Sequence, residues 1–294
     1  MAKKELDLLQ DKPASAILKF AVPMLIGALF QQVYSLVDTV VVGNFINSDA
    51  LAAVGTSGVI MNIVTMAGMG LAVGTSVVTA QYFGAKKLRE VKTAIRTSLI
   101  VFVALGLGGG ALGLAIMKPM LQLMNTPLEM MDYALSYLGV IFIGVVFVML
   151  YNMFNQVSIA LGDSKTPMIM LLAASAINVV LDLVFTLVCH WGTAGVAAAT
   201  VIGQGFAALT CWRLIQKKMN QMVTEQPAWF DKQMLKSICA IGLPAVAQNA
   251  ISASGMLAVQ SLLNSFGSVT VAAYTAANKV DGIAMSPMVS LGTA

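Results

Sequence analysis

Eight long apolar segments follow one another along this chain, and they restrict it to one class of fold. Each has about 20 residues or more, the length that a helix needs to cross the hydrocarbon core of a bilayer. The predicted spans are 16–42, 51–82, 97–117, 133–161, 167–188, 195–215, 235–263 and 269–291. Because a chain in lipid must satisfy its backbone hydrogen bonds internally, we expect an all-α, polytopic membrane protein.

Composition excludes the other broad classes. Hydrophobic residues make up 58% of the chain and charged residues only 10%, with a mean hydropathy of +0.84. A soluble domain carries about 25% charged residues, and a disordered chain needs low hydrophobicity and high charge. The three cysteines have no metal-ligand spacing and there is one histidine. We therefore expect no disulfide, no metal site built on histidine, no cofactor and no enzymatic activity.

The basic residues predict the orientation in the membrane. Fifteen of the 17 lysine and arginine residues lie before the first span or at its start, between the second and third, between the fourth and fifth, and after the sixth. Lysine and arginine accumulate in cytoplasmic loops, so the N-terminus is predicted to be cytoplasmic, in a prokaryotic inner membrane. The charges are spread over four loops without interleaved aromatic residues, and we expect no nucleic-acid partner.

A weak internal repeat predicts two related bundles. Pro23 near the start of the first span matches Pro244 in the seventh at an offset of 221 residues, and Phe45 matches Phe266 at the same offset. Parallel repeats of this kind are a known plan for transporters. The repeat predicts a six-helix bundle over 1–216, a cytoplasmic linker over 217–234, and the first two helices of a second bundle over 235–294. The intact protein would then have roughly 440 residues, twice the repeat, and this chain would be incomplete at its C-terminal side.

Ionisable residues within a membrane span are functional candidates by default. Asp38 lies late in the first span, and Gln31, Tyr34, Ser35 and Asp38 share one helical face by their i, i+3, i+4, i+7 spacing. The alternative is a carboxylate that only joins helices through hydrogen bonds.

Two further polar pairs lie in the fifth and sixth spans. Asn178 and Asp182 are one turn apart, so they can offer three or four oxygens to a hard cation or hold a proton on the carboxylate. The alternative is a capping or packing pair near the outer interface. Thr200 and Gln204 are also one turn apart, and alone such a pair more often joins helices.

Other features have weaker interpretations. Lys279 and Asp281 lie in the eighth span but do not face each other. The 20 methionines are either core filler or an adaptable wall for varied substrates. The glycine-rich stretch 106–113 lies in mid-membrane, where we expect it to allow close helix packing rather than phosphate binding.

Several motifs, taken in order, resemble those of multidrug and toxic compound extrusion (MATE) transporters. They are Pro23-Met-Leu-Ile-Gly27, Val33-Tyr-Ser-Leu-Val-Asp38-Thr-Val-Val-Val-Gly43, Ala50-Leu-Ala-Ala-Val-Gly55, Gln81-Tyr-Phe-Gly-Ala85, Ala160-Leu-Gly-Asp-Ser-Lys-Thr-Pro167 and Gly195-Val-Ala-Ala-Ala-Thr200. The resemblance covers essentially the whole chain. It implies twelve helices in two six-helix lobes and a monomer that exports small, mostly cationic organic compounds from the membrane by alternating access, in exchange for Na⁺ or H⁺.

The resemblance also implies a site. The family's ion site in the first lobe matches Asp38, Asn178, Asp182 and Thr200 here, with Na⁺ held by Asp38, Asn178 and Asp182 if Na⁺ is the ion. We take the remaining intramembrane polar residues as candidates for the substrate cavity: Gln31, Tyr34, Ser35, Gln204, Lys279 and Asp281. Some family members carry a glutamate where this chain has Ser252, which argues against a carboxylate site at that position.

Two other functions fit the sequence less well. A flippase of the same superfamily, moving a lipid-linked precursor, would need several basic residues in its cavity, and Lys279 is the one intramembrane candidate. An intramembrane aspartyl hydrolase could use Asp38 with Asp182, but it would need the two carboxyl groups at shared-proton distance together with water.

Overall fold

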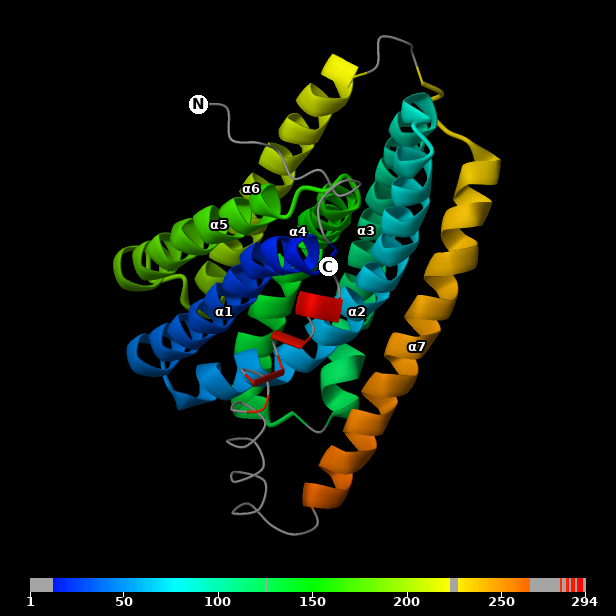
Figure 1. Cartoon of the computed structure of the whole chain (residues 1–294). Coiled ribbons are helices and arrows are strands. Elements are labelled where there is room, and N and C mark those ends of the chain that lie inside the picture. Colours follow the sequence, from blue (N-terminus) through cyan, green and yellow to red (C-terminus); the bar gives the residue numbers. More distant parts are fainter. Residues whose placement is uncertain are drawn as a thin grey trace.

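The computed structural model consists of long helices joined by short connections (Figure 1). It describes residues 13–124, 126–222 and 227–264, and near the C-terminus 281, 284–285, 287–288 and 290–292. The helices are α1 (Pro13–Phe45), α2 (Ser48–Gly84), α3 (Leu88–Leu123), α4 (Leu128–Ala160), α5 (Lys165–Leu183) with the π-helix η1 (Val184–Val188), α6 (Gly192–Met222) and α7 (Lys232–Asn264).

These helices confirm the predicted fold class. Within the described residues, six helices, α2 to α7, are long and apolar enough to cross a membrane, and α1 contains the shorter apolar stretch Ala21–Gln32. Most of the eighth predicted span, with Lys279, lies outside the described residues.

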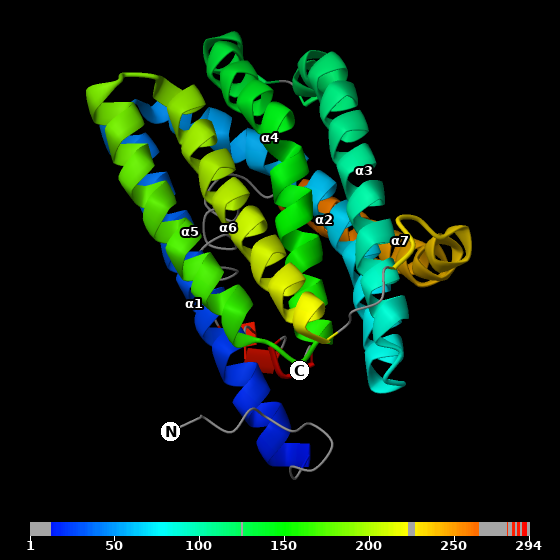
Figure 2. The same cartoon turned by 90° about the horizontal axis from the view of Figure 1, so that it is seen from above.

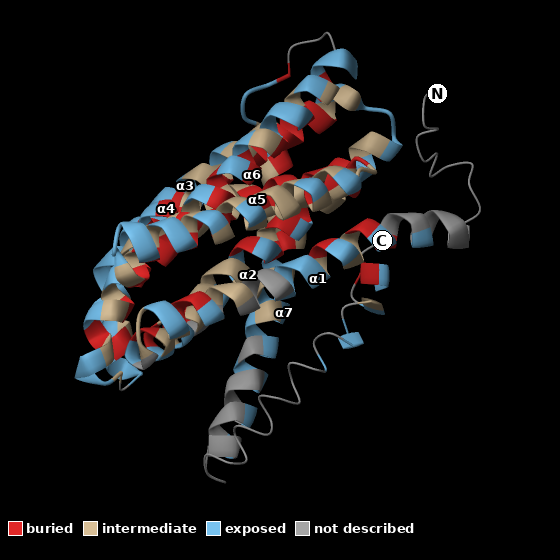
Figure 3. Ribbon diagram, turned by 90° about the vertical axis from the view of Figure 1, so that its left-hand side faces the viewer, coloured by how far each residue is buried: buried red, intermediate tan, exposed pale blue. Residues whose placement is uncertain are grey.

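Helix α4 is the centre of the bundle. It packs against α2, α3 and α6, while α5 lies between α1 and α6. The view from above shows α4 between α6 and α3, with α1 beside α5 at one side (Figure 2). Buried residues gather on the inward faces of these helices, and exposed ones face outward (Figure 3).

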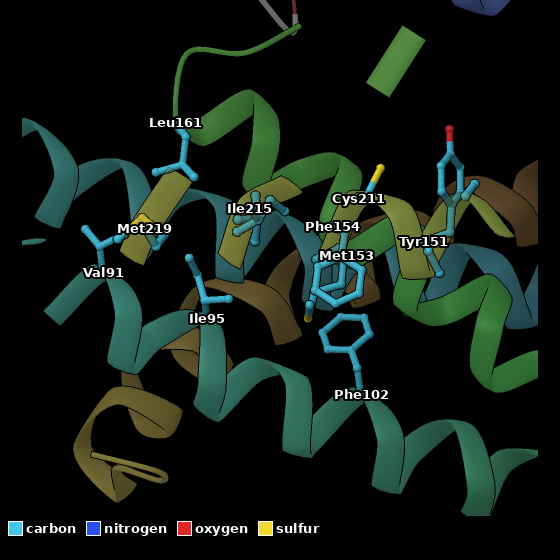
Figure 4. Packing of buried hydrophobic residues seen from close by; sticks show 14 of the residues in the cluster. Val91, Ile95, Phe102, Tyr151, Met153, Phe154, Leu161, Cys211, Ile215 and Met219 are labelled. Carbon is cyan, nitrogen blue, oxygen red and sulfur yellow. The ribbon is translucent and has the colours of Figure 1, made fainter. Parts of the chain in front are cut away.

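The largest core cluster joins α3, α4 and α6. Phe102 of α3 and Phe154 of α4 belong to this cluster and lie near each other, and Ile215 and Met219 of α6 extend it toward the end of that helix (Figure 4). Each of these four side chains is at most 4% exposed. Burial of such side chains in a close-packed cluster gives dispersion contacts that a helix facing only lipid would lack.

The glycine-rich stretch of α3 allows α4 to approach closely, as its position predicts. A Cβ added at Gly106 would lie 2.7 Å from Cα of Val146, and one at Gly110 would lie 2.5 Å from the carbonyl oxygen of Phe142. Gly108 and Gly109, by contrast, have nothing within 4 Å of such a Cβ. Two faces of one glycine-rich segment therefore differ, and only one of them forms the helix contact.

Several helices continue past the predicted spans. Helix α6 reaches Met222, well into the predicted 217–234 linker, and its Met219 is 1% exposed. Helix α3 continues through Pro119 to Leu123, and α5 ends in the π-helix η1, which the sequence did not indicate. Hydropathy locates the part of a helix that lies in lipid, whereas good helix formers such as Lys and Gln extend it into the interface.

Polar side chains join three helix ends on the side opposite the basic loops. Asn47 caps α2 by accepting from the Ala50 amide at 2.7 Å, and its Nδ2 donates to the Tyr133 hydroxyl at 2.9 Å. Thr193, at the start of α6, donates to the Tyr133 carbonyl at 2.9 Å. The starts of α2, α4 and α6 are thereby held together, as an up-and-down bundle requires.

Residues of α3 hold the segment that leads into α7. The Arg96 guanidinium lies 4.6 Å from the centre of the Trp229 ring, and its Nη1 donates to the Pro227 carbonyl at 3.3 Å. The Asp231 amide donates to the Thr97 hydroxyl at 3.1 Å. Because α7 begins at the next residue, Lys232, these contacts fix where it starts relative to the bundle.

Helix α7 packs mainly on α2, in the half that follows its start. A Cβ added at Gly70 would lie 2.6 Å from the amide nitrogen of Val246, and one at Gly74 would lie 2.8 Å from the amide nitrogen of Gly242. Two small residues four apart let two backbones meet this closely. Farther along α7, Ile251 is 74% exposed.

Candidate ion-coupling site

The two carboxyl groups singled out by the sequence meet inside the bundle. Asp38 comes from the second half of α1 and Asp182 from the second half of α5, and their carboxyl groups lie close enough to interact with each other. Asp182 is 0% exposed. A hydrogen bond between two carboxyl groups requires one proton, so this pair holds a single negative charge when the bond is present.

Asn178 joins Asp182 to α6. One placement of its amide gives a single bond, from Nδ2 to the Thr200 hydroxyl at 3.2 Å. With the amide turned over, Nδ2 donates to Asp182 Oδ2 at 3.0 Å, and Oδ1 accepts from the hydroxyl (3.2 Å) and amide (3.1 Å) of Thr200. The second placement satisfies more groups, and we adopt it. Asn178 is 2% exposed, so these bonds are sheltered from solvent.

Three buried oxygens near this network have no partner among the described residues. They are Asp38 Oδ1, Asp182 Oδ1 and Gln204 Oε1. A buried polar atom without a partner is costly, and each such atom calls for an explanation such as an unseen water or ion. A free oxygen on each carboxyl group gives the pair two acceptors for a cation.

A small cavity lies beside Asn178. It measures about 20 Å³, enough for one water, and its polar lining comes from Gln31, Ser175, Asn178, Thr200 and Gln204. The cavity places Gln31 and Gln204, both predicted from the sequence, next to the Asn178–Thr200 bond.

A larger cavity of about 180 Å³ lies toward the start of α1 and α5 and shares Gln31 and Leu171 with the small one. Pro23, Met24, Tyr151, Asn155 and Met168 are among its lining residues. Sequence analysis missed Tyr151 and Asn155, although their i, i+4 spacing on α4 is the signal that identified Asn178 with Asp182. Two of the 20 methionines, Met24 and Met168, lie in the described lining of this cavity.

The structure does not bring every predicted site residue to this place. Tyr34 and Ser35 belong to α1, but their side chains lie outside the described part, as does Lys279 entirely. Asp281 is exposed and lines neither described cavity. Asp38, Asn178, Asp182 and Thr200 thus form the contiguous group, with Gln31 and Gln204 at its edge.

The donor set suits a proton or a hard monovalent cation. It offers carboxyl oxygens from two helices, the amide oxygen of Asn178 and the hydroxyl of Thr200. Oxygen donors of this kind favour hard cations. The described residues contain no cluster of three or more His, Cys, Asp or Glu side chains, so the group rests on one carboxyl pair and neutral oxygens.

Comparison with known proteins agrees with the resemblance in the sequence. The family model described as MatE matches residues 23–184, more than half of the chain. The probable multidrug resistance protein YpnP of Bacillus subtilis is 30% identical over 99% of this chain and 65% of its own length. The multidrug export protein MepA of Staphylococcus haemolyticus is 25% identical over 88% of this chain and 58% of its own length. The chain spans less than two thirds of either relative.

Solved structures give the same result for the fold. A transporter of the MOP superfamily from Pyrococcus furiosus has a TM-score of 0.90 at 26% identity, over 100% of this chain and 65% of that one. A multidrug resistance MATE transporter in an outward-facing conformation has the same TM-score, identity and coverage.

Proposed function

We propose that this chain, which belongs to the MatE family, forms the ion-coupling half of a transporter that exports organic cations in exchange for Na⁺ or H⁺. The observation that carries the proposal is the meeting of Asp38 with the buried Asp182, extended by Asn178 and Thr200. Nothing in an apolar bundle requires two carboxyl groups to meet, and ionisable groups within a membrane are costly unless they serve a pathway.

The proposed mechanism is alternating access. A Na⁺ ion or a second proton on the carboxyl pair neutralises its charge and so favours whichever conformation buries it better. Transport follows only if the ion and the cationic substrate have different affinities for the two conformations. Residues of α1 line both cavities, so a movement of α1 at Asp38 can reach the larger cavity through the same helix. Pro23 has no backbone N–H, so α1 lacks one helical hydrogen bond near that cavity and can bend there.

Transport in proteoliposomes tests the proposal. The protein would be reconstituted with a fluorescent organic cation, and Na⁺ and pH gradients would be imposed separately. We expect one of the two gradients to drive transport of the fluorescent cation. Vesicles in which both gradients have been collapsed should show no transport. Equal transport without either gradient would contradict coupling, while transport with both gradients equally effective would mean that the site accepts either ion.

The two alternative functions, a flippase and an intramembrane hydrolase, can be compared with the residues and volumes of the cavities. Among the described residues, the lining of the two cavities includes no arginine or lysine, which gives no support to a flippase for anionic precursors. The two carboxyl groups that the hydrolase would use do lie near each other, but the adjacent cavity of about 20 Å³ has room for one water and no peptide. A peptidase assay on the purified protein, expected to be negative, separates the hydrolase from a transporter.

The charge asymmetry predicts which loops face the cytoplasm. We expect single cysteines introduced at Lys86 and Lys232 to resist an impermeant maleimide in intact cells and to react after permeabilisation. A cysteine at Glu129, at the opposite end of the bundle, is the control and should react in intact cells. The reverse pattern would invert the topology.

The neutral ligands should contribute less than the carboxyl groups. We expect Asn178→Ala and Thr200→Ala each to reduce coupled export by about tenfold, because a single hydrogen bond to a charged group is worth about 1.5–3 kcal/mol. Thr79→Ala is the control, since Thr79 is 0% exposed and its hydroxyl has no partner among the described residues, but it lies on α2 away from the site. Unchanged export in both variants would remove Asn178 and Thr200 from the site.

A further inference from the structure

A polar groove runs along the last turns of α6, outside the site described above. Its volume is about 490 Å³, and its lining residues are Trp212, Arg213, Gln216, Lys217, Asn220 and Gln221. They follow i, i+4, i+8 spacing and so share one face of the helix. This end of α6 adjoins the segment predicted to be cytoplasmic, which places the groove at the inner surface of the membrane.

Arg213 and Lys217 make the groove positively charged, and none of its described lining residues is acidic. Arg213 and Lys217 have no ion-pair partner among the described residues, and the sequence of α6 contains no acidic residue. The helix dipole does not account for them, because its influence is confined to the last turn, and the last turn of α6 has no basic residue.

A buried lysine lies behind the groove. Lys92 of α3 is 7% exposed, and its Nζ donates to Asn220 Oδ1 at 2.7 Å. A buried ammonium needs compensation, and the group that Lys92 contacts here is a neutral amide. Because Oδ1 of Asn220 faces Lys92, the Nδ2 group of the same amide remains to donate on the side of the groove.

The apolar surface beside the groove indicates that the anion carries apolar chains. Ile202, Phe206 and Leu209 are 43–48% exposed, and their i, i+4, i+7 spacing continues through Arg213 on one face of α6. The groove is therefore the polar end of an apolar stripe, with Trp212, 37% exposed, at the level where tryptophan favours the membrane interface.

We propose that this groove binds the phosphate of an anionic phospholipid of the cytoplasmic leaflet. Arg213, Lys217 and Asn220 Nδ2 contact the phosphate, Lys92 supplies buried positive charge behind Asn220, and the acyl chains lie along Ile202, Phe206 and Leu209. A soluble phosphate would use the basic residues but leave the apolar stripe without a role. Basic residues immediately cytoplasmic of a membrane helix attract anionic lipid headgroups in the same way.

Native mass spectrometry on the full protein in neutral detergent, titrated with phosphatidylglycerol, tests the site. We expect saturable binding of phosphatidylglycerol and none of phosphatidylcholine. The double variant Arg213→Gln/Lys217→Gln should weaken binding by about 30-fold. Lys218→Gln is the matched control: it removes the same charge one residue away, but Lys218 lines a different pocket, with Asp163, and affinity should change less than about twofold.

Two further measurements make each outcome decisive. Glycerol phosphate, the headgroup without acyl chains, should fail to compete at concentrations where the lipid saturates; competition equal to that of the lipid would overturn the lipid assignment. Asn220→Ala should weaken binding; because it also removes the amide that Lys92 contacts, the temperature of unfolding is measured for the same variant. Equal weakening by Lys218→Gln and by the double variant would reduce the groove to general surface charge and contradict the proposal.

Discussion

Replacing either carboxyl group by its amide, Asp38→Asn or Asp182→Asn, is expected to reduce ion-driven export to the background of vesicles without protein. Asparagine keeps nearly the same volume and some hydrogen bonding, so the packing of α1 against α5 should survive. It removes the negative charge and the ability to take up a proton, and both a cation site and a proton site require them. The loss should therefore appear in coupling rather than in folding.

The measurement is ion-driven uptake of a fluorescent cation into inverted vesicles, with protein amount and unfolding temperature checked for each variant. Asp132→Asn is the matched control, because Asp132 is an exposed aspartate at the start of α4 and its change should leave export intact. A structural role for the pair would give variants that transport at the normal rate under both gradients. In that case coupling must lie elsewhere, with Asp281 as the next candidate.

The second large effect concerns the contact of α2 with α7. We expect Gly74→Val to abolish export, because the new Cβ would lie 2.8 Å from Gly242 N and 3.0 Å from Gly242 Cα, and a backbone cannot move aside as a side chain can. Overpacking of this kind costs about 1–3 kcal/mol or more. The helices would separate in the half of the bundle that holds the basic loops, and the proposed alternating-access mechanism needs a closed contact there in one of its two states.

Gly55→Val on the same helix is the control, since nothing lies within 4 Å of a Cβ at Gly55. Labelling of Cys239, which is half-buried on α7 beside Ile238, measures separation independently of transport. In a Cys189→Ser background we expect Gly74→Val to speed maleimide labelling of Cys239 and Gly55→Val to leave it unchanged. Normal export and labelling in Gly74→Val would show that the contact has room that the structure does not reveal.

Part of the candidate site could be predicted from the sequence, as the polar pairs show. The i, i+4 spacing alone placed Asn178 with Asp182, and the burial of both follows from their position within an apolar span. The same spacing applied to α4 would have found Tyr151 and Asn155. The signal for these two residues is therefore present in the sequence.

The sequence by itself determined the class of fold, the approximate spans and the side of the membrane predicted for each loop, because hydropathy and charge act on each segment separately. Only the tertiary structure decided that Asp38 meets Asp182, that Gly106 and Gly110 face α4 while Gly108 does not, and that α5 ends in a π-helix. The physical reason is that every apolar helix satisfies its own backbone in lipid. Which faces then meet depends on how side chains of different helices interdigitate, and no local pattern contains that information.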